Sequence, residues 1–529
     1  RGEPATGGSM TRRGRGGRRH RGTAIRALVF SVPLCLGATV SGFSQCPDGS
    51  PPPCAGRAVR APTPTANTVA VLYFDNRSRD SNDLYLADGL TEEIITRLSG
   101  IERLTVRSRH LVRRYRGAAL EDPAAAGRAL NVSYLVSGSV RRAGGRLRVS
   151  AELIRASGGA QVWGRQFDQA GDDVFAIQEA VAREVATGIV GRLLPNEVRT
   201  LAERPTASPA AYEAFLRGNF HVARRDSAGV ARAVQEYETA LRADSAYTDA
   251  LSRVAMAYGI AYLNGLRIGL PADTVAARAT SAAVEAVRRA PNSSDAWVAM
   301  GVARLAARPR SLAGAREAFE RAITLDPTSA EPHHLLGFTL ALLGQDSAGL
   351  EHDRQALAIE PARPITLMHF VQYAIKTGRY AEARRWVDSA LVLDRDFYLA
   401  RATLATLLLL SGDTVRARAE VERWSDLPPL RGVAAPARQV LTLSGLDSAA
   451  ARRLLGEVRA TIPADLPASL AAYTAMFVMA ASRDPGIVMD VLEAARPRER
   501  FLHYLMTAVI FDPIRSDPRF ARLFREVSP

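Results

Sequence analysis

Through the second half of the chain, apolar residues recur with the spacing of amphipathic helices, and helix-ending residues recur about every 34 positions, at Pro327, Pro361, Arg395, Pro429 and Pro463. Just upstream of the first three, the text reads AFERAITLDP, DRQALAIEP and VDSALVLDR, each an apolar helix ending in an acidic residue and a helix stop. A fixed period of this length is typical of a solenoid of stacked helix pairs.

Small and aromatic residues mark fixed places within these predicted pairs. Gly301 on a first helix and Phe319 on the second are typical, because the small residue lets the helices approach while the ring fills the volume between units. The pattern predicts an insertion around Leu266 to Asp273 and becomes faint after Pro429. The ending from Phe511, FDPIRSDPRFARLF, is predicted to cap the last helix pair.

The first half of the chain instead carries short apolar runs separated by turn residues. TVAVLYF predicts a buried strand, and DGLTEEIITRLSG predicts a helix with Thr91 as its N-cap and Gly100 as its stop. RLRVSAELIR alternates as a strand with one buried face. The order β-α-β-α-β-β-β-α predicts an α+β/α multidomain fold class: a small α/β domain with a mixed sheet at residues 68–195, then an all-α tetratricopeptide solenoid at 208–529.

Three ordered blocks of the first half resemble a known family. They are VAVLYFDNRSRDSNDLYLADGLTEEIITRLS, YLVSGSVRRAGGRLRVSAELIRASGGAQVWGRQFD and DDVFAIQEAV. The stretch from Thr68 to Leu194 is similar to the bacterial TolB-like amino-terminal domain, which is related to FlgO-type domains. The resemblance implies a domain that commonly precedes tetratricopeptide repeats and follows a cytoplasmic output module and a membrane span. No such module fits ahead of the apolar segment here, so we expect a version without its own output domain, and the resemblance supplies no catalytic residue.

The apolar segment Ala27–Val40 follows a block of arginines directly, which is the pattern of a secretory signal. We predict an N-terminal extension and signal peptide over 1–44, cut before Gln45, and a Pro-rich linker over 45–67. This places the protein in the periplasm or outside the cell. The alternative is an uncleaved signal anchor that attaches the chain to the inner membrane through residues 27–43.

Charge and cysteine content change this picture little. The net charge is +15, from 69 basic and 54 acidic residues, but Lys376 is the only lysine. An arginine excess of this kind is better explained by the codon bias of a GC-rich genome than by phosphate contacts, so no nucleic-acid partner is expected. Cys46 and Cys54 flank a short Pro-rich turn and are predicted to form one disulfide in an oxidising compartment.

Known catalytic motifs are missing from the sequence. It has no Gly-Lys-Ser/Thr phosphate loop, no serine with glycine at both minus two and plus two, and no H-E-x-x-H. We therefore expect no enzyme, no catalytic or cofactor-binding residue and no metal site. His333, His334, His352 and His369 lie on neighbouring repeat helices, and a metal held by them is the alternative to isolated solvated or core histidines.

The concave face of the predicted solenoid is the expected binding surface. Its mostly apolar character suits an extended peptide or an amphipathic helix of a protein partner. The alternative is that several of these side chains pack against the next repeat. The predicted function is a non-enzymatic, exported binding or assembly module, and the alternative is a membrane-anchored sensory or regulatory protein whose output domain is on a partner. The predicted peptide-binding residues are Asp295, Val298, Val302, His334, Phe338, Met368, Gln372 and Lys376.

Overall fold

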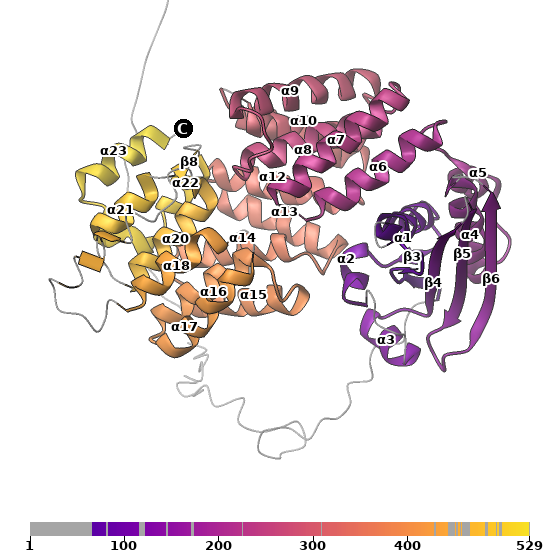
Figure 1. Cartoon of the computed structure of the whole chain (residues 1–529), viewed down its shortest axis with the longest axis horizontal. Helices are drawn as coiled ribbons and strands as arrows, with labels where there is room; N and C mark the ends of the chain where they lie inside the picture. Colours follow the sequence, from indigo (N-terminus) through magenta and orange to yellow (C-terminus); the bar gives the residue numbers. More distant parts are fainter. Residues whose placement is uncertain are drawn as a thin grey trace, which may run out of the picture. The chain divides into compact units, whose positions relative to one another are not determined.

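A computed structural model provides the structure of the chain. The residues it describes are 66–80, 83–115, 122–143, 146–170, 174–224, 226–307, 309–427, 430–442, 450, 453–454, 456–457, 466–481, 485–493, 495–496 and 500–527. The predicted signal segment and Cys46–Cys54 disulfide lie outside these residues, as does the predicted linker up to residue 65. A small domain built on a sheet comes first along the chain, and a long series of helices follows it (Figure 1).

The sheet of the first domain is mixed, as predicted. Its strand order is β3-β1-β4-β5-β6, and β2 pairs with β4. The strand β1 runs parallel to β3 and β4, whereas β4, β5 and β6 form an antiparallel meander. The alternation predicted for β5 is confirmed, because Leu147, Val149, Ala151 and Leu153 are all buried. The strands are β1 (Thr68–Val71), β2 (Asp75–Asn76), β3 (Thr105–Val106), β4 (Tyr134–Ala143), β5 (Arg146–Arg155) and β6 (Gln161–Ala170).

Helices α1 and α4 contact each other and contribute their apolar faces to the core of the sheet domain. Gly100 ends α1 as predicted, but the prediction of Thr91 as N-cap is wrong, because the helix begins at Leu84. Thr91 is buried inside the helix, where its hydroxyl accepts a hydrogen bond from the Phe74 N–H (3.0 Å) and donates one to the Ala87 carbonyl (2.8 Å). The helical elements here are α1 (Leu84–Ser99), α2 (Arg109–Val112), η2 (Arg113–Tyr115), α3 (Pro123–Leu130), α4 (Val174–Val190) and α5 (Pro195–Ala202).

The series of helices that follows is a solenoid of the tetratricopeptide type, in which each helix packs against the next along the chain. Three glycines spaced 34 residues apart, Gly344, Gly378 and Gly412, have φ of +78°, +73° and +82° between the two helices of a pair. This left-handed turn favours glycine, which explains the period in the sequence. The regular helices are α6 (Pro209–Val222), α7 (Ser227–Ala243), α8 (Thr248–Leu263), α9 (Ala272–Arg289), α10 (Ser294–Ala306), α11 (Leu312–Leu325), α12 (Ala330–Leu342), α13 (Asp346–Ile359), α14 (Pro364–Lys376), α15 (Tyr380–Leu393), α16 (Tyr398–Leu410) and α17 (Thr414–Glu422).

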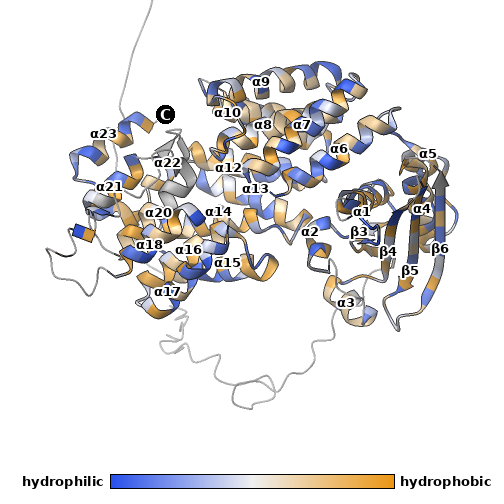
Figure 2. Ribbon diagram, in the orientation of Figure 1, coloured by the Kyte–Doolittle hydropathy of each residue, from blue (hydrophilic) through white to orange (hydrophobic). Residues whose placement is uncertain are grey.

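The two helices of a pair contact each other through small residues and rings, as predicted. A Cβ atom at Gly301 would lie 2.3 Å from the Phe319 ring, and one at Gly218 would lie 2.4 Å from the Tyr237 ring. Apolar residues accordingly concentrate where helices face one another (Figure 2). These contacts leave room for hydrogen and no larger group at either glycine.

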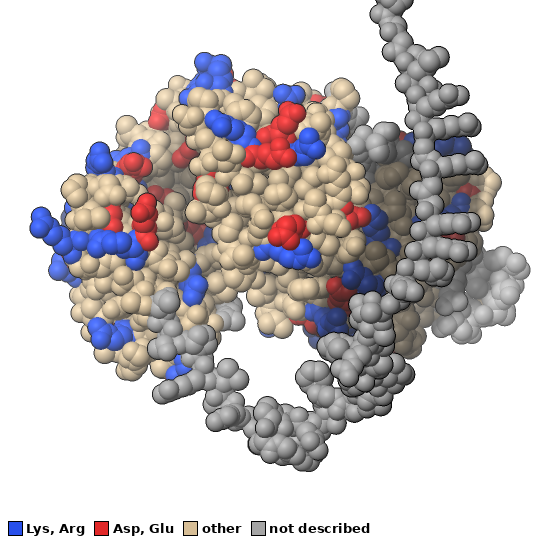
Figure 3. Space-filling view, turned by 180° about the vertical axis from the view of Figure 1, so that it is seen from behind, with Lys and Arg blue, Asp and Glu red and all other residues tan. Residues whose placement is uncertain are grey.

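Charges of opposite sign lie next to each other on the surface. Figure 3 shows basic and acidic side chains in small mixed groups on the face drawn. Arg288 and Arg289 both pair with Glu285, at 2.5 Å each, and similar pairs occur on many other helices. Ten basic and two acidic residues precede residue 66, so +8 of the net charge of +15 belongs to that part of the sequence.

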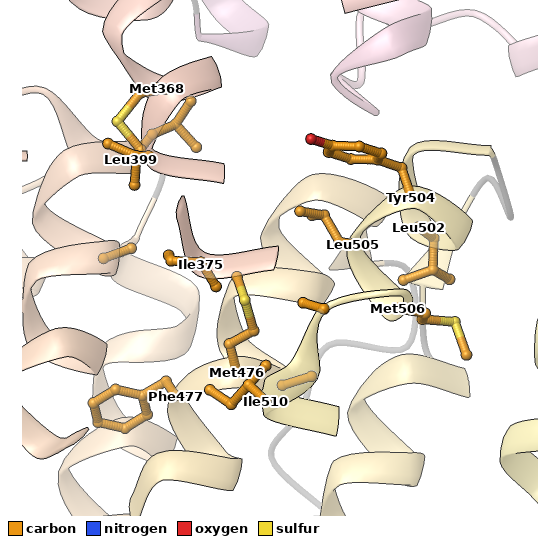
Figure 4. Packing of buried hydrophobic residues seen from close by; sticks show 14 of the residues in the cluster. Met368, Ile375, Leu399, Met476, Phe477, Leu502, Tyr504, Leu505, Met506 and Ile510 are labelled. Atoms are coloured by element: carbon orange, nitrogen blue, oxygen red, sulfur yellow. The ribbon is translucent and has the colours of Figure 1, made fainter. Parts of the chain in front are cut away.

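The C-terminal segment reaches further back than a cap on the last helix pair. Helix α22 contacts α12 and α20, and η5 contacts α14 and α20. In Figure 4, Ile375 of α14, Met476 of α20, Leu505 of α22 and Ile510 of η5 gather in one apolar cluster. The elements of this part are η3 (Arg423–Asp426), α18 (Arg431–Val440), β7 (Leu466–Pro467), α20 (Ala468–Ala481), α21 (Pro485–Glu493), β8 (Ala495–Arg496), α22 (Arg500–Met506), η5 (Val509–Ile514) and α23 (Pro518–Val527).

Two further features bear on the predictions. The short strands β7 and β8 pair in parallel, so the repeat region is mostly rather than entirely helical. Among the described helices, none combines the length and the apolar content needed to cross a membrane.

Candidate functional site

The most unusual polar group of the solenoid is a buried cluster of two histidines and one aspartate, contributed by three successive helices. His334 lies on α12, Asp353 on α13 and His369 on α14. The Nδ1 atom of His369 lies 2.9 and 3.0 Å from the two carboxylate oxygens of Asp353, and the Nδ1 atom of His334 lies 3.6 Å from one of them. The three residues are 6%, 1% and 8% exposed.

The repeat itself explains how an aspartate reaches this depth. Asp353 follows Phe319 by 34 residues, one full period, and so occupies the place that an aromatic ring fills in the preceding pair. The contact with the first helix is preserved, because a Cβ atom at Gly337 would lie 2.9 Å from the Asp353 carboxylate. A buried carboxylate is costly unless it is paired, so this position requires the nearby imidazoles.

Neighbouring side chains hold both imidazoles in place. The rings of His334 and His369 stack with their centroids 4.6 Å apart, and Phe338 stacks on His369 at 5.6 Å. The Thr366 hydroxyl lies 3.3 Å from Nδ1 of His334. These contacts limit rotation of the rings, so the nitrogen atoms are already directed towards the carboxylate.

The pKa values of the cluster follow from burial and from the partners. Burial raises the pKa of Asp353, but its interactions with His369 and His334 lower it more, so that it lies below its ordinary value. Burial is also the main cause that lowers the pKa of His334, to about 4, against the opposing effect of Asp353. The carboxylate is therefore ionised at neutral pH, while the His334 imidazole is neutral.

A small cavity adjoins the cluster. It has a volume of ≈ 10 Å³, and Asp353, His369, Asp346, Tyr373 and Tyr504 are among its lining residues. This is about the space that one water molecule needs. Asp346 and Tyr373 also line an open surface hollow of ≈ 460 Å³ at the turn between α12 and α13, so the two spaces are neighbours.

The structure corrects the predicted peptide-binding face. Val298, Val302, Met368 and Gln372 are 4%, 2%, 0% and 8% exposed, so they offer almost no surface to a ligand. Val302 occupies the space in front of Gly259 on α8, where a Cβ atom would approach it to 2.3 Å. The alternative, that these side chains pack against the neighbouring helices, describes them correctly.

The other predicted binding residues have different surroundings. Lys376 forms an ion pair with Asp346 at 2.6 Å, and its Nζ lies 4.6 Å from the centre of the Tyr504 ring. Phe338 is half-buried beside His369, and His334 belongs to the buried cluster. Asp295 alone is well exposed, at 54% of its side chain, and pairs with Arg253 at 3.3 Å.

His333, His334 and His369 are buried, as core histidines are expected to be, but they are not isolated. His334 and His369 converge on Asp353, and His333 and His352 form a second pair with their Nδ1 atoms 3.1 Å apart. Sequence reasoning missed Asp353. The signal was present, because an acidic residue at the aromatic position of a repeat departs from the pattern of the pair before it.

Comparison with known proteins gives partial likenesses. Residues 65–184 match the family described as the second domain of HilA/YgeH-like transcriptional regulators. A protein named putative adenylate cyclase 3, from Rhizobium meliloti (strain 1021), is 36% identical over 154 residues, which are 29% of this chain and 26% of that protein. The chain thus spans about a quarter of that relative's length.

Solved structures resemble the repeat region only loosely. The tetratricopeptide protein TTC0263 of Thermus thermophilus is 20% identical with a TM-score of 0.33, covering 38% of this chain and 100% of that one. The complex of Cut9 and Hcn1 from the APC/C gives 12% identity and a TM-score of 0.41, covering 67% of this chain and 63% of that one. YrrB, a tetratricopeptide protein with an unusual peptide-binding site, is 18% identical with a TM-score of 0.24, covering 37% of this chain and 97% of that one.

Proposed function

We propose that this protein is a non-enzymatic binding module, exported from the cytoplasm, that holds a protein partner through its helix repeats. The support for a protein partner is the architecture: successive helix pairs present an extended surface, which suits a peptide or a helix better than a small molecule. The support for export is the signal-like segment at residues 27–43, and the support for a TolB-like first domain is the resemblance between Thr68 and Leu194.

The observation that carries this proposal is the exposed ion pair on α8 and α10. Arg253 and Asp295 are 39% and 54% exposed, while the apolar residues next to them on α10, Val298 and Val302, are buried. Two opposite charges held side by side at the surface, on helices fixed by buried residues beneath them, can each pair with a charged group of a partner and so hold it in one orientation. The proposed contact surface therefore begins at Asp295 and Arg253, and does not include the buried residues of α14.

A display selection with the purified full chain tests this surface. Peptides that bind the wild-type chain are expected to lose at least about tenfold in affinity, or ~1.4 kcal/mol, for Asp295→Lys. The matched control is Arg288→Glu, another exposed charge reversal, located on α9, which should leave the affinity unchanged. A selection without binders, or equal affinities for the Asp295→Lys variant and the wild type, contradicts the proposal.

A second candidate function is a regulatory protein anchored by residues 27–43, with its output domain on a partner. The match of residues 65–184 to a domain of transcriptional regulators favours it. The intact mass of the mature chain discriminates between the two candidates. A mature chain that begins near Gln45 excludes an anchor at 27–43, whereas retention of this segment excludes a cleaved signal peptide.

A further inference from the structure

We propose that His334, Asp353 and His369 form a binding site for one transition-metal ion, with Zn²⁺ as the best match. The three residues bring one ligand atom each within 4.8 Å of the others, from three separate helices. This site is independent of the partner surface around Asp295.

The distances within the cluster are those of a set of metal ligands. Four-coordinate zinc binds imidazole nitrogen and carboxylate oxygen at about 2.0–2.2 Å, which places neighbouring ligand atoms roughly 3.3–3.5 Å apart. From Oδ1 of Asp353, the Nδ1 atoms of His369 and His334 lie 3.0 Å and 3.6 Å away, on either side of this range. Shifts of a few tenths of an ångström bring these two separations to those of zinc ligands.

The second histidine distinguishes a metal site from a buried ion pair. One imidazole, His369, already satisfies the Asp353 carboxylate at hydrogen-bonding distance. His334 nevertheless directs its Nδ1 to the same carboxylate at 3.6 Å and is fixed there by ring stacking. Two imidazoles and one carboxylate favour zinc over calcium or magnesium, which bind through oxygen ligands.

The adjoining cavity supplies the fourth coordination position and an access route. Its volume of ≈ 10 Å³ matches one metal-bound water, and Asp353 and His369 both line it. Asp346 lies between this cavity and the open hollow, and its Oδ1 is buried with no hydrogen-bond partner among the described residues. The other oxygen, Oδ2, is paired with Lys376 at 2.6 Å, so Oδ1 is the atom of Asp346 that can accept a hydrogen bond from the bound water.

The experiment uses the full chain without a histidine tag, stripped with a chelator and then dialysed against Zn²⁺. We expect one equivalent of bound zinc by elemental analysis, and a visible absorption band of four-coordinate Co²⁺ when cobalt is used as a probe. Asp353→Asn and His369→Gln should each weaken zinc binding by at least about tenfold, since outer-shell losses alone reach 10–100-fold. His333→Gln is the matched control, because His333 pairs with His352 in the same repeat, and this variant should bind zinc normally.

The wild-type measurement alone can overturn the proposal. A wild-type chain that binds no zinc after dialysis contradicts it, whatever the variants do. Equal zinc binding by wild type and Asp353→Asn also contradicts it, as does equal loss in His333→Gln. Circular dichroism of each variant separates loss of the ligand from loss of the fold, and the cobalt band of the wild type does not depend on any variant.

Discussion

Tyr212 on α6 is expected to join the first repeat helix to the core of the sheet domain. Its side chain is 1% exposed and lies in the same apolar cluster as residues of α1 and α4. The ring centroid is 4.2 Å from that of Phe175, and the hydroxyl donates a hydrogen bond of 2.9 Å to Oε1 of Gln178, which is fully buried. Helix α6 is therefore part of two structures, the solenoid and the sheet domain.

Two substitutions separate the ring from the hydroxyl. Tyr212→Phe keeps the ring but leaves the Gln178 oxygen unpaired, which costs about 1–3 kcal/mol for a buried group. Tyr212→Ala also creates a cavity and removes the ring contact, and a buried aromatic truncated in this way typically costs about 3–5 kcal/mol. The free energy of unfolding should thus fall in the order wild type, Tyr212→Phe, Tyr212→Ala.

Urea unfolding of the full chain, followed by far-UV circular dichroism, measures the difference. Phe220→Ala is the matched control, since Phe220 is half-buried on the same helix and should cost less than Tyr212→Ala. A loss below about 1 kcal/mol for Tyr212→Ala refutes the claim that α6 completes the core of the sheet domain.

Gly301→Ala should destabilise the protein by about 1–3 kcal/mol despite the better helix propensity of alanine, because the added Cβ meets the Phe319 ring. Adding Phe319→Leu should restore part of the loss in melting temperature. A Gly301→Ala variant that is more stable than wild type contradicts this packing. Burial and the nearby Asp295 carboxylate raise the pKa of Asp249 to about 6. The ionised Asp249 therefore destabilises the folded protein, and this loss of stability grows as the pH rises from about 4 to 6. Asp249→Asn should therefore be more stable than wild type by about 1–3 kcal/mol at pH 7.5, with a smaller gap at pH 5, and an equal gap at both pH values counts against this pKa. Arg519→Ala should weaken the packing of α23, because the Arg519 guanidinium lies 2.5 Å from each of two carboxylates of α21. We expect faster proteolysis after residue 515 in this variant, and an unchanged rate contradicts the prediction.

The parts of the fold that the sequence predicts are those fixed by local chemistry. The turns at Gly344, Gly378 and Gly412 need a left-handed backbone, so their spacing gives the period of the solenoid directly. The strand β5 alternates because one face is buried, and this alternation is readable from ten residues. The mixed sheet followed by helix pairs was predictable for these reasons.

The binding face was not predictable, because it depends on burial from every side. Nine of the thirteen residues of α12 are buried, so the apolar positions on this helix do not reveal which face meets a partner. The C-terminal helix α22 also covers part of α12, and a contact between such distant segments leaves no periodic signal. Apolar residues such as Met368 were therefore assigned to a groove that the structure fills.

The buried histidine cluster was predictable from the sequence only in part. The departure from the pattern at Asp353 is visible in the sequence, but its meaning depends on two histidines from different helices that reach it. Spacing along a chain does not give distances between repeats, and a single helix shift would separate these side chains. The structure was needed to bring them together.

We propose that the repeats hold a protein partner at the surface around Asp295. The most direct test places a photoreactive benzophenone amino acid at position 295 of the full chain, with the same residue at position 288 as control, and exposes each protein to a peptide selected on the wild type. We expect a covalent peptide adduct from position 295 and none from position 288. An adduct from position 288 alone, or none from either position, would contradict it.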